Sequence, residues 1–190
     1  NSEDKKVYYS SNPKQQAQYI NMLKNADKTV VVLDGMLDIP FMQHIEMQNS
    51  GVRFARVDAE LVDSDETQNH LFDMLCEYTK KQVDENVEIK AQKIGDNIPA
   101  ILLLDEFSRR MDEAQKYYGM ASLGGNLKYT LVLNTDSTLI QAINKMDDGQ
   151  KKETSVKYVY DLARLSHGTL PPEDIDKFIE NSASLLEKSL

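Results

Sequence analysis

Hydrophobic and polar positions follow two different patterns along this chain. Over residues 1–63, short β-branched or aromatic runs alternate with segments whose apolar residues recur at helical spacing. The run at 29–33 is continuously apolar, which is typical of a parallel strand covered on both faces. This part is therefore predicted to be a small three-layer α/β unit. Its strands are predicted at 7–9, 29–33 and 52–57, and its helices after Pro13 and over 39–47.

The second pattern mixes strands with helices and ends in helices. It begins after a polar, acidic segment at 63–66, where we place a domain boundary. Gly168 is predicted to end the penultimate helix, because glycine accepts the left-handed backbone conformation. Pro171 and Pro172 with the acids that follow favour the start of the last helix. The fold class is thus predicted to be α/β in the first part and α+β over the whole chain. The chain would consist of an α/β subdomain at 1–63 and a mixed domain at 64–190 that ends in helices. The later helices are predicted at 66–83, 107–118, from 136 or 137 onwards, at 153–166 and after 171, and the strands at 87–90, 99–104 and 129–133.

One predicted helix carries a stripe of adaptable apolar side chains. Phe107, Met111, Ala114 and Tyr118 fall at i, i+4, i+7 and i+11, which is one helical face. Methionine and aromatic side chains suit contacts with varied partners. The stripe could bind such partners, or it could pack on the sheet of its own domain.

The last two helices also carry broad apolar faces. A second copy of the chain could cover them in a four-helix bundle with twofold symmetry. Alternatively, both helices could pack only on their own domain. The residues predicted for the dimer interface are Val156, Val159, Tyr160, Ala163, Ile175, Phe178, Ile179 and Leu186.

Composition narrows the classes of partner. The net charge is −9 and no basic stripe is present, so nucleic acid is not expected as a partner. No stretch approaches the roughly 20 apolar residues that span a bilayer, and the polar amino terminus lacks the apolar core of a signal peptide. The lone cysteine, Cys76, is predicted to be a small buried residue and fits a reducing compartment. We therefore expect a cytoplasmic protein without membrane contact.

Candidate chemistry is sparse. Asp34 follows an apolar strand, the position of the phosphoacceptor in receiver domains, but the magnesium-binding acidic pair that such chemistry needs is replaced by Ser10, Ser11 and Asn12. A turn or capping role for Asp34 is the alternative. The chain has no phosphate-binding glycine loop and no Gly-x-Ser-x-Gly elbow. No catalytic or metal site is predicted, and the histidines at 44, 70 and 167 are isolated from one another.

The order of several short motifs resembles the carboxy-terminal portion of the ninety-kilodalton heat-shock protein family in its bacterial form. The collinear order of these motifs, over nearly the whole chain, carries the resemblance. The chain departs from the family pattern at 134–138, which lacks a proline and a histidine, and at Arg164, where leucine is usual. The matching segments are Val7-Tyr8-Tyr9, Val31-Val32-Leu33-Asp34, Leu37-Asp38 with Pro40-Phe41, Ile98-Pro99-Ala100-Ile101, the helix 107–118, Leu131-Val132-Leu133-Asn134 through Leu139-Ile140, and Tyr160-Asp161-Leu162-Ala163-Arg164-Leu165 with Gly168.

The resemblance implies the end of a middle domain followed by a dimerisation domain of an ATP-dependent chaperone. It implies a homodimer through the last helices and client contact through the helix 107–118. This fragment would not itself be an enzyme, because ATP and magnesium would bind in the amino-terminal domain of the parent protein. The chain does not end in the acidic Met-Glu-Glu-Val-Asp tail, so partners with tetratricopeptide repeats are not expected. A stand-alone dimerisation module without client contact is the main alternative.

Overall fold

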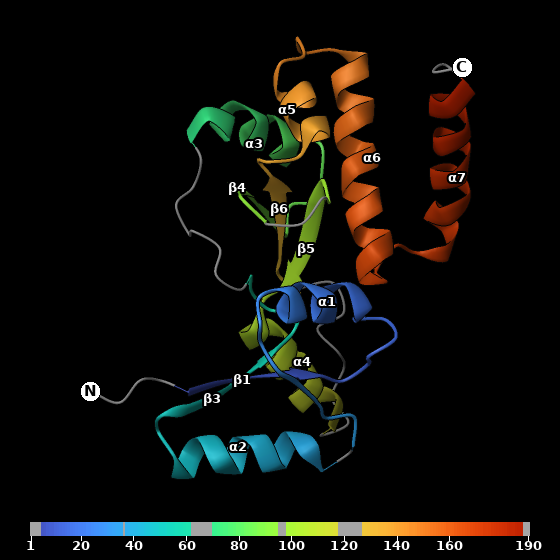
Figure 1. Ribbon diagram of the computed structural model, residues 1–190. Helices are drawn as coiled ribbons and strands as arrows, with labels where there is room; N and C mark the ends of the chain where they lie inside the picture. The colour runs from blue at the N-terminus through green and yellow to red at the C-terminus, as the bar shows by residue number, and fades with distance from the viewer. Residues whose placement is uncertain (1–4, 36, 62–69, 95–97, 118–126, 188–190) are drawn as a thin grey trace. The chain divides into compact units, whose positions relative to one another are not determined.

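The computed structural model describes residues 5–35, 37–61, 70–94, 98–117 and 127–187. The chain divides into two compact units, each built on its own three-stranded sheet (Figure 1). Unit 1 comprises residues 1–63 and 103–128, and unit 2 comprises residues 64–102 and 129–190. The segment 103–128 thus groups with unit 1, although strands of unit 2 precede and follow it in the sequence. A domain boundary between residues 63 and 64 stays a prediction.

Unit 1 has the parallel sheet that its sequence pattern predicts. The central strand β1 (Lys5–Ser10) pairs in parallel with β2 (Val30–Val32) on one side and with β3 (Val52–Arg56) on the other. The connections are α1 (Ala17–Asn25) and α2 (Asp38–Gln48). Alternation of strand and helix therefore gives the expected α/β arrangement.

The core of unit 1 is small, and one of its strands is more exposed than predicted. Tyr9, Met42 and Phe54 are buried against one another at its centre. The expectation that 29–33 is covered on both faces is wrong, because Val31 and Val32 are 37% and 54% exposed. The cause is the position of β2 at the edge of the sheet, where it is only three residues long and pairs with β1 alone.

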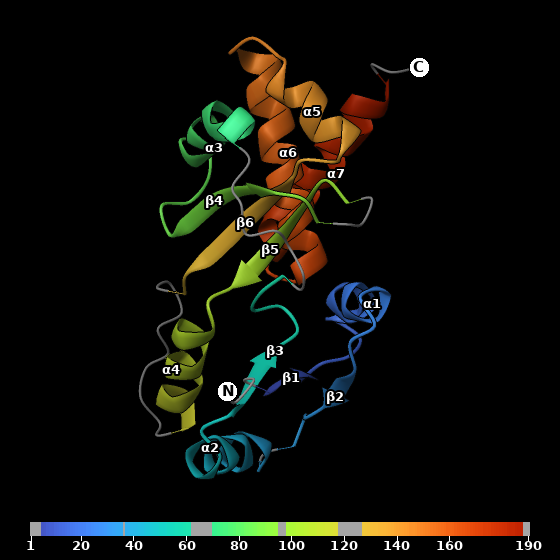
Figure 2. The ribbon, with the colours of Figure 1, turned by 60° about the vertical axis from the view of Figure 1, so that its left-hand side comes forward.

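Unit 2 combines a second sheet with helices. In this sheet β6 (Tyr129–Asn134) lies between β4 (Val87–Gln92) and β5 (Ala100–Leu104), and β4 is parallel to β6 (Figure 2). The predicted helix 66–83 is described only from residue 70, and its regular part is shorter than expected. The helical elements are η1 (His70–Phe72), α3 (Asp73–Lys80), α5 (Thr138–Asn144), α6 (Gln150–His167) and α7 (Pro172–Glu187).

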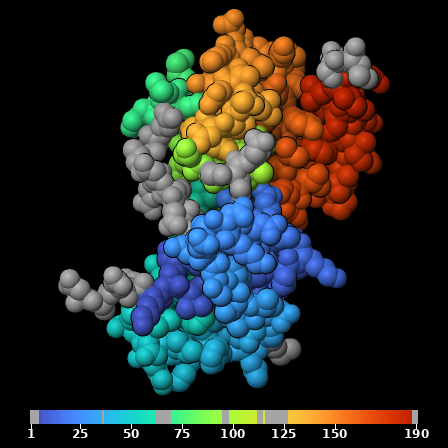
Figure 3. Space-filling model, in the orientation of Figure 1, coloured from blue at the N-terminus to red at the C-terminus, as the bar shows by residue number. Residues whose placement is uncertain are grey.

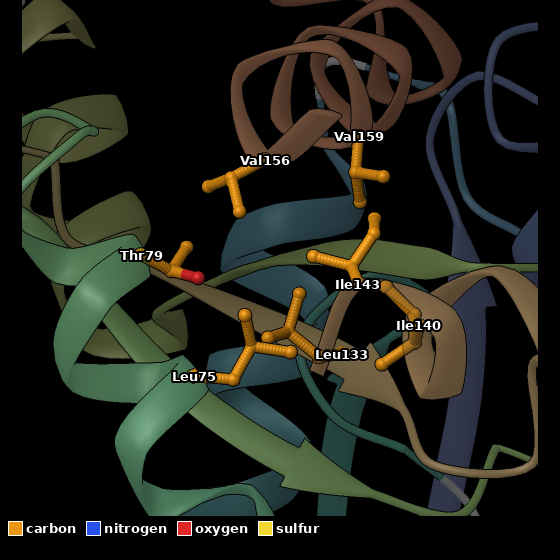
Figure 4. A pocket seen from close by; sticks show the side chains of 7 residues that line it. All are labelled: Leu75, Thr79, Leu133, Ile140, Ile143, Val156 and Val159. Carbon is orange, nitrogen blue, oxygen red and sulfur yellow. The ribbon is translucent and has the colours of Figure 1, made fainter. Parts of the chain in front are cut away.

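The core of unit 2 lies between its sheet and the helices α3, α5 and α6. A small apolar void remains inside it, toward which the hydroxyl of Thr79 points (Figure 4). Within the described residues, no helix is long and apolar enough to cross a membrane. The buried residues of this core are Phe72, Leu75, Cys76, Val87, Ala91, Ala100, Leu102, Leu131, Leu133, Ile140, Ile143, Val156, Val159, Tyr160 and Ala163.

The junction between α6 and α7 forms as the sequence predicts. Gly168 adopts a left-handed conformation with φ of 81° and ends α6. The amide of Thr169 then donates a hydrogen bond to the carbonyl of Arg164 at 2.9 Å. Pro172 begins α7, and Glu173 and Asp174 lie in its first turn, where the helix dipole favours acids.

Candidate functional site

The helix α4 (Glu106–Tyr117) exposes the two residues of the predicted stripe that the structure describes in full. Phe107 is 73% exposed and Met111 is 42% exposed, so neither is packed on a sheet. Ala114 lies within α4, but its side chain, like the whole of Tyr118, lies outside the described residues. The described half of the predicted stripe is therefore open to a partner.

Polar side chains of α4 contact the rest of unit 1, to which the helix itself belongs. Arg109 is 5% exposed, and its Nη2 donates hydrogen bonds to Tyr9 Oη and to Glu106 Oε1, each at 2.6 Å. Arg110 Nη1 donates to Glu46 Oε2 at 2.8 Å, and Arg110 Nη2 donates to the carbonyl of Phe54 at 2.8 Å. Within unit 1, α4 is thus tied to β1, β3 and α2 by arginines.

The opposite charges of Glu46 and Arg110 strengthen the attachment of α4. Burial alone would raise the pKa of Glu46, but hydrogen bonds from Arg110 and from the amide of Phe54 outweigh it and lower the pKa. The hydrogen bond to Glu46 is also the main reason that the pKa of Arg110 is raised. Both groups therefore keep their charges around neutral pH, and the pair is a charge-assisted contact.

The four α6 residues predicted for the dimer interface are buried in unit 2. Val156, Val159, Tyr160 and Ala163 are each at most 7% exposed and belong to the core. The Tyr160 hydroxyl donates a 2.8 Å hydrogen bond to Asp84, and burial, reinforced by this bond, raises the pKa of Tyr160. These side chains hold α6 on its own unit, so in this structure they offer no surface to a second copy.

The α7 residues predicted for the same interface are placed differently. No residue of α7 is buried, Ile175 and Phe178 are half-buried, and Ile179 and Leu186 are 57% and 61% exposed. The helix lies beside α6 (Figure 1) and forms a ridge of side chains on the surface (Figure 3). An apolar face therefore remains uncovered along α7.

A few contacts attach α7 to α6. The ring of Phe178 stacks on Tyr158 with centroids 5.1 Å apart and planes 10° apart. Arg164 on α6 lies 3.3 Å from Asp161 on the same helix and 3.5 Å from Asp174 on α7. These contacts fix the first turns of α7, while the exposed Leu186 lies near its far end.

The candidates for chemistry gain no support from their surroundings. Asp34 is exposed, and the Ser10 hydroxyl at the end of β1 donates to Gln16 Oε1 at 2.8 Å. Burial raises the pKa of the Cys76 thiol to about 11, so it is a poor nucleophile near neutral pH. Among the described residues, no group of three or more His, Cys, Asp or Glu side chains could hold a metal ion.

Comparison with curated proteins adds a resemblance to one kind of protein. Over 151 residues the chain is 30% identical to "Chaperone protein htpG" of Bacteroides fragilis. The aligned region covers 71% of this chain and 22% of that protein. The chain contains a region similar to part of HtpG chaperones. "Chaperone protein HtpG" of Bacteroides thetaiotaomicron is 26% identical over the same length, with the same coverage of both chains. That of Porphyromonas gingivalis is 30% identical over 168 residues, or 78% of this chain and 24% of the relative.

The HtpG-like region corresponds to a small part of the relatives. The chain spans only 22–24% of the length of these proteins. No protein-family model matches the chain. The family resemblance seen in the motifs is thus supported as a partial match.

The arginine contacts of α4 are the feature that sequence reasoning missed. The adjacent pair Arg109-Arg110 was a visible signal, because the two residues lie off the apolar stripe at 107 and 111. Their partners could not be found from sequence, since Glu46 is 64 positions from Arg110 and Tyr9 is 100 positions from Arg109.

Proposed function

We propose that this chain is the dimerising, client-contacting carboxy-terminal part of an HtpG-type molecular chaperone. The resemblance to HtpG chaperones supports the general role. The observation that carries the proposal is the apolar face of α7, none of whose residues is buried in the protomer. A helix with such a face gains stability when another apolar surface covers it.

The partner that we propose for α7 is a second copy of the chain. Ile175, Phe178, Ile179 and Leu186 form the contact surface, and the buried α6 residues behind it keep α6 fixed. Pairing of α7 with its counterpart gives the closed, twofold arrangement that is most common among homodimers.

Sedimentation equilibrium tests this dimer. We expect the unmodified chain to be a dimer at micromolar concentration, and Ile179→Glu with Leu186→Glu to weaken association at least tenfold, because two charges would be desolvated at the interface. Asn181→Glu is the matched control, since it adds a charge at an exposed polar position of α7. An unmodified chain that stays monomeric at about 100 μM, where a stable dimer would be saturated, contradicts the proposal.

We propose that the apolar stripe on α4 is a second binding surface, and that it binds client proteins. Phe107 is aromatic and Met111 is flexible, and both are exposed. Arginine contacts on the other side of the helix attach α4 to the rest of unit 1. Unfolded segments expose apolar side chains, which such a stripe can cover without a fixed sequence.

Binding of reduced, carboxymethylated α-lactalbumin, a soluble unfolded protein, tests this assignment by fluorescence anisotropy. We expect Phe107→Glu with Met111→Glu to weaken binding at least threefold and to leave the thermal midpoint unchanged, because both side chains are on the surface. Met47→Glu is the control, since Met47 is 87% exposed in the same unit but lies on α2. Unaltered binding by the α4 variant would instead favour a dimerisation module without a client role.

The remaining expectations belong to the whole protein. We propose that ATP and magnesium bind in a part of the whole protein outside this chain, and that this chain is not itself an enzyme. We also propose a cytoplasmic homodimer that binds unfolded proteins and does not bind nucleic acid or membranes.

A further inference from the structure

The orientation of α4 is the reverse of what its amphipathic pattern would ordinarily produce. A surface helix normally buries its apolar face and leaves its polar face in water. Among the residues of α4 whose side chains the structure describes, Ser108 and Arg109 are buried, whereas Phe107 and Met111 are exposed. Polar contacts therefore determine which side of α4 faces solvent.

Arg110 makes the most extensive of these contacts. Its guanidinium binds both carboxylate oxygens of Glu46, at 2.8 and 3.3 Å, and the carbonyl of Phe54 at 2.8 Å. Glu46 also accepts the amide of Phe54 at 2.7 Å, so the carboxylate is held by β3 as well as by its own helix α2. Arg110 thus docks on a carboxylate whose position is already fixed.

Arg109 provides a second point of attachment, one residue earlier. Its guanidinium lies 5.8 Å from the centre of the Tyr9 ring, and Tyr9 is only 2% exposed. Glu106 is shared between the two arginines, accepting from Arg109 Nη2 at 2.6 Å and from Arg110 Nε at 2.7 Å. The two attachments together fix both the position and the rotation of α4.

We propose that Arg109 and Arg110 are positioning residues that hold Phe107 and Met111 of α4 outward, and that this orientation depends on the Arg110–Glu46 ion pair, called the latch below. The inference rests on the proposed client contact and adds the contacts that position it. Because the described contacts that attach α4 are hydrogen bonds and ion pairs of Arg109 and Arg110, breaking the latch weakens what keeps the helix in this rotation. Phe107 and Met111 then turn away from solvent or lose their fixed spacing, and client binding falls.

Hydrogen exchange across the full chain tests the latch. We expect Glu46→Gln and Arg110→Gln to speed amide exchange in α4 at least tenfold while β1 and β3 keep their protection. Arg110→Lys keeps the charge and should restore part of the protection. Glu60→Gln is the matched control, because the Lys6–Glu60 pair at 2.6 Å lies in the same unit and involves no residue of α4.

A reporter on the stripe gives an independent reading of its orientation. The chain has no tryptophan, so Phe107→Trp introduces a single tryptophan on the exposed face, whose emission can be excited selectively over that of tyrosine. We expect Glu46→Gln to change quenching of this tryptophan by acrylamide at least twofold, and Glu60→Gln to leave it unchanged. In chains that retain Phe107, Glu46→Gln and Arg110→Gln should also weaken binding of carboxymethylated α-lactalbumin at least threefold.

The outcomes separate the latch from the proposed function. If Phe107→Glu with Met111→Glu weakens α-lactalbumin binding but Glu46→Gln and Arg110→Gln change neither exchange nor binding, the latch is overturned and the client surface stands. If the stripe variant binds as the unmodified chain does, the client surface itself is refuted. Loss of protection throughout β1 and β3 in the Glu46 and Arg110 variants would also overturn the latch, because the pair would then support the whole unit.

Discussion

Two consecutive helices, α6 and α7, differ in what covers their apolar residues. The α6 helix buries Val156, Val159 and Ala163 in the core of unit 2, whereas α7 buries no residue at all. Both sequences place apolar residues at helical spacing, and the two helices have similar lengths, 18 and 16 residues. The difference arises because α6 packs with α3, α5 and the sheet, while α7 is held mainly through α6.

The spacing of apolar residues along a helix therefore shows which residues share a face but not what covers that face. The face of α6 serves the fold of its own unit, and the face of α7 remains available to a second copy. In α4 the described apolar residues Phe107 and Met111 are also exposed, and there arginine contacts attach the other side of the helix. Substitutions on α6 and α7 test this difference directly.

The largest difference is expected from placing an aspartate on each helix. Val159→Asp should lower the free energy of unfolding by about 3–5 kcal/mol or prevent folding, because it leaves an unpaired charge in the core. Ile179→Asp should change the stability of the monomer by less than about 0.5 kcal/mol, because Ile179 is on the surface. Urea unfolding followed by circular dichroism, at concentrations low enough to exclude dimers, measures both. Equal losses for the two variants would mean that α7 belongs to the core, and the contrast would disappear.

A gain of stability is expected from the void beneath α6. Thr79 is 1% exposed, and within the described part of the chain its hydroxyl has no hydrogen-bond partner; its neighbours are mostly aliphatic and include Val156 (Figure 4). Thr79→Val removes the unsatisfied hydroxyl at similar volume and should raise the free energy of unfolding by about 1 kcal/mol. Thr154→Val is the control, because that hydroxyl bonds the carbonyl of Gln150 at 2.8 Å and its removal should bring no gain. A destabilised Thr79→Val protein would show that the hydroxyl has a partner.

Much of the fold could be predicted from local sequence. The alternation of strand and helix up to residue 57, the left-handed Gly168 and the start of α7 at Pro172 follow from rules that act within a few residues. The exposure of Val31 and Val32 could not be predicted, because a continuous apolar run does not show whether its strand lies at the centre or the edge of a sheet.

The candidate surfaces could be predicted only in part. The spacing at 107 and 111 identified the stripe on α4, and that at 175, 178, 179 and 186 identified the face of α7. Spacing could not separate these from Val156 and Val159, which share a helical pattern but pack on the sheet. The partners of Arg110 were also hidden, because Glu46 and Phe54 meet it only through tertiary structure.

A smaller loss is expected where α7 meets α6. Tyr158→Leu removes the stacked ring beneath Phe178 and the weak 3.4 Å hydrogen bond from Ser182 Oγ. An aromatic pair of this kind contributes about 0.5–1.5 kcal/mol beyond its buried area, so amide exchange in α7 should become about two- to tenfold faster. The amides of β6 should keep their protection, since Tyr158 lies outside the buried core. Equal acceleration in β6 and α7 would show that the stack supports the whole unit.

The smallest effect is expected from the ionic contacts at the same junction. Burial raises the pKa of Asp161, Arg164 partly opposes this, and the carboxylates of Asp174 and Asp84 raise it further. A folded-state pKa above the unfolded value means that the fold holds this proton more tightly. The contribution of Asp161 to stability is therefore present below the ordinary pKa of aspartate and is lost as pH rises through the raised pKa.

Asp161→Asn should remove that part of the pH dependence. Over about pH 4 to 7 its urea midpoint should fall less steeply than that of the unmodified chain, and Arg164 retains Asp174 at 3.5 Å as a partner. Asp176→Asn is the control, because it makes the same substitution at an exposed position of α7. A variant at position 161 that keeps the full slope would show that the fold does not hold the Asp161 proton more tightly. Arg164 would then fully offset the burial of the Asp161 carboxylate, and the ionic contacts would support the attachment of α7 together with the Tyr158–Phe178 stack.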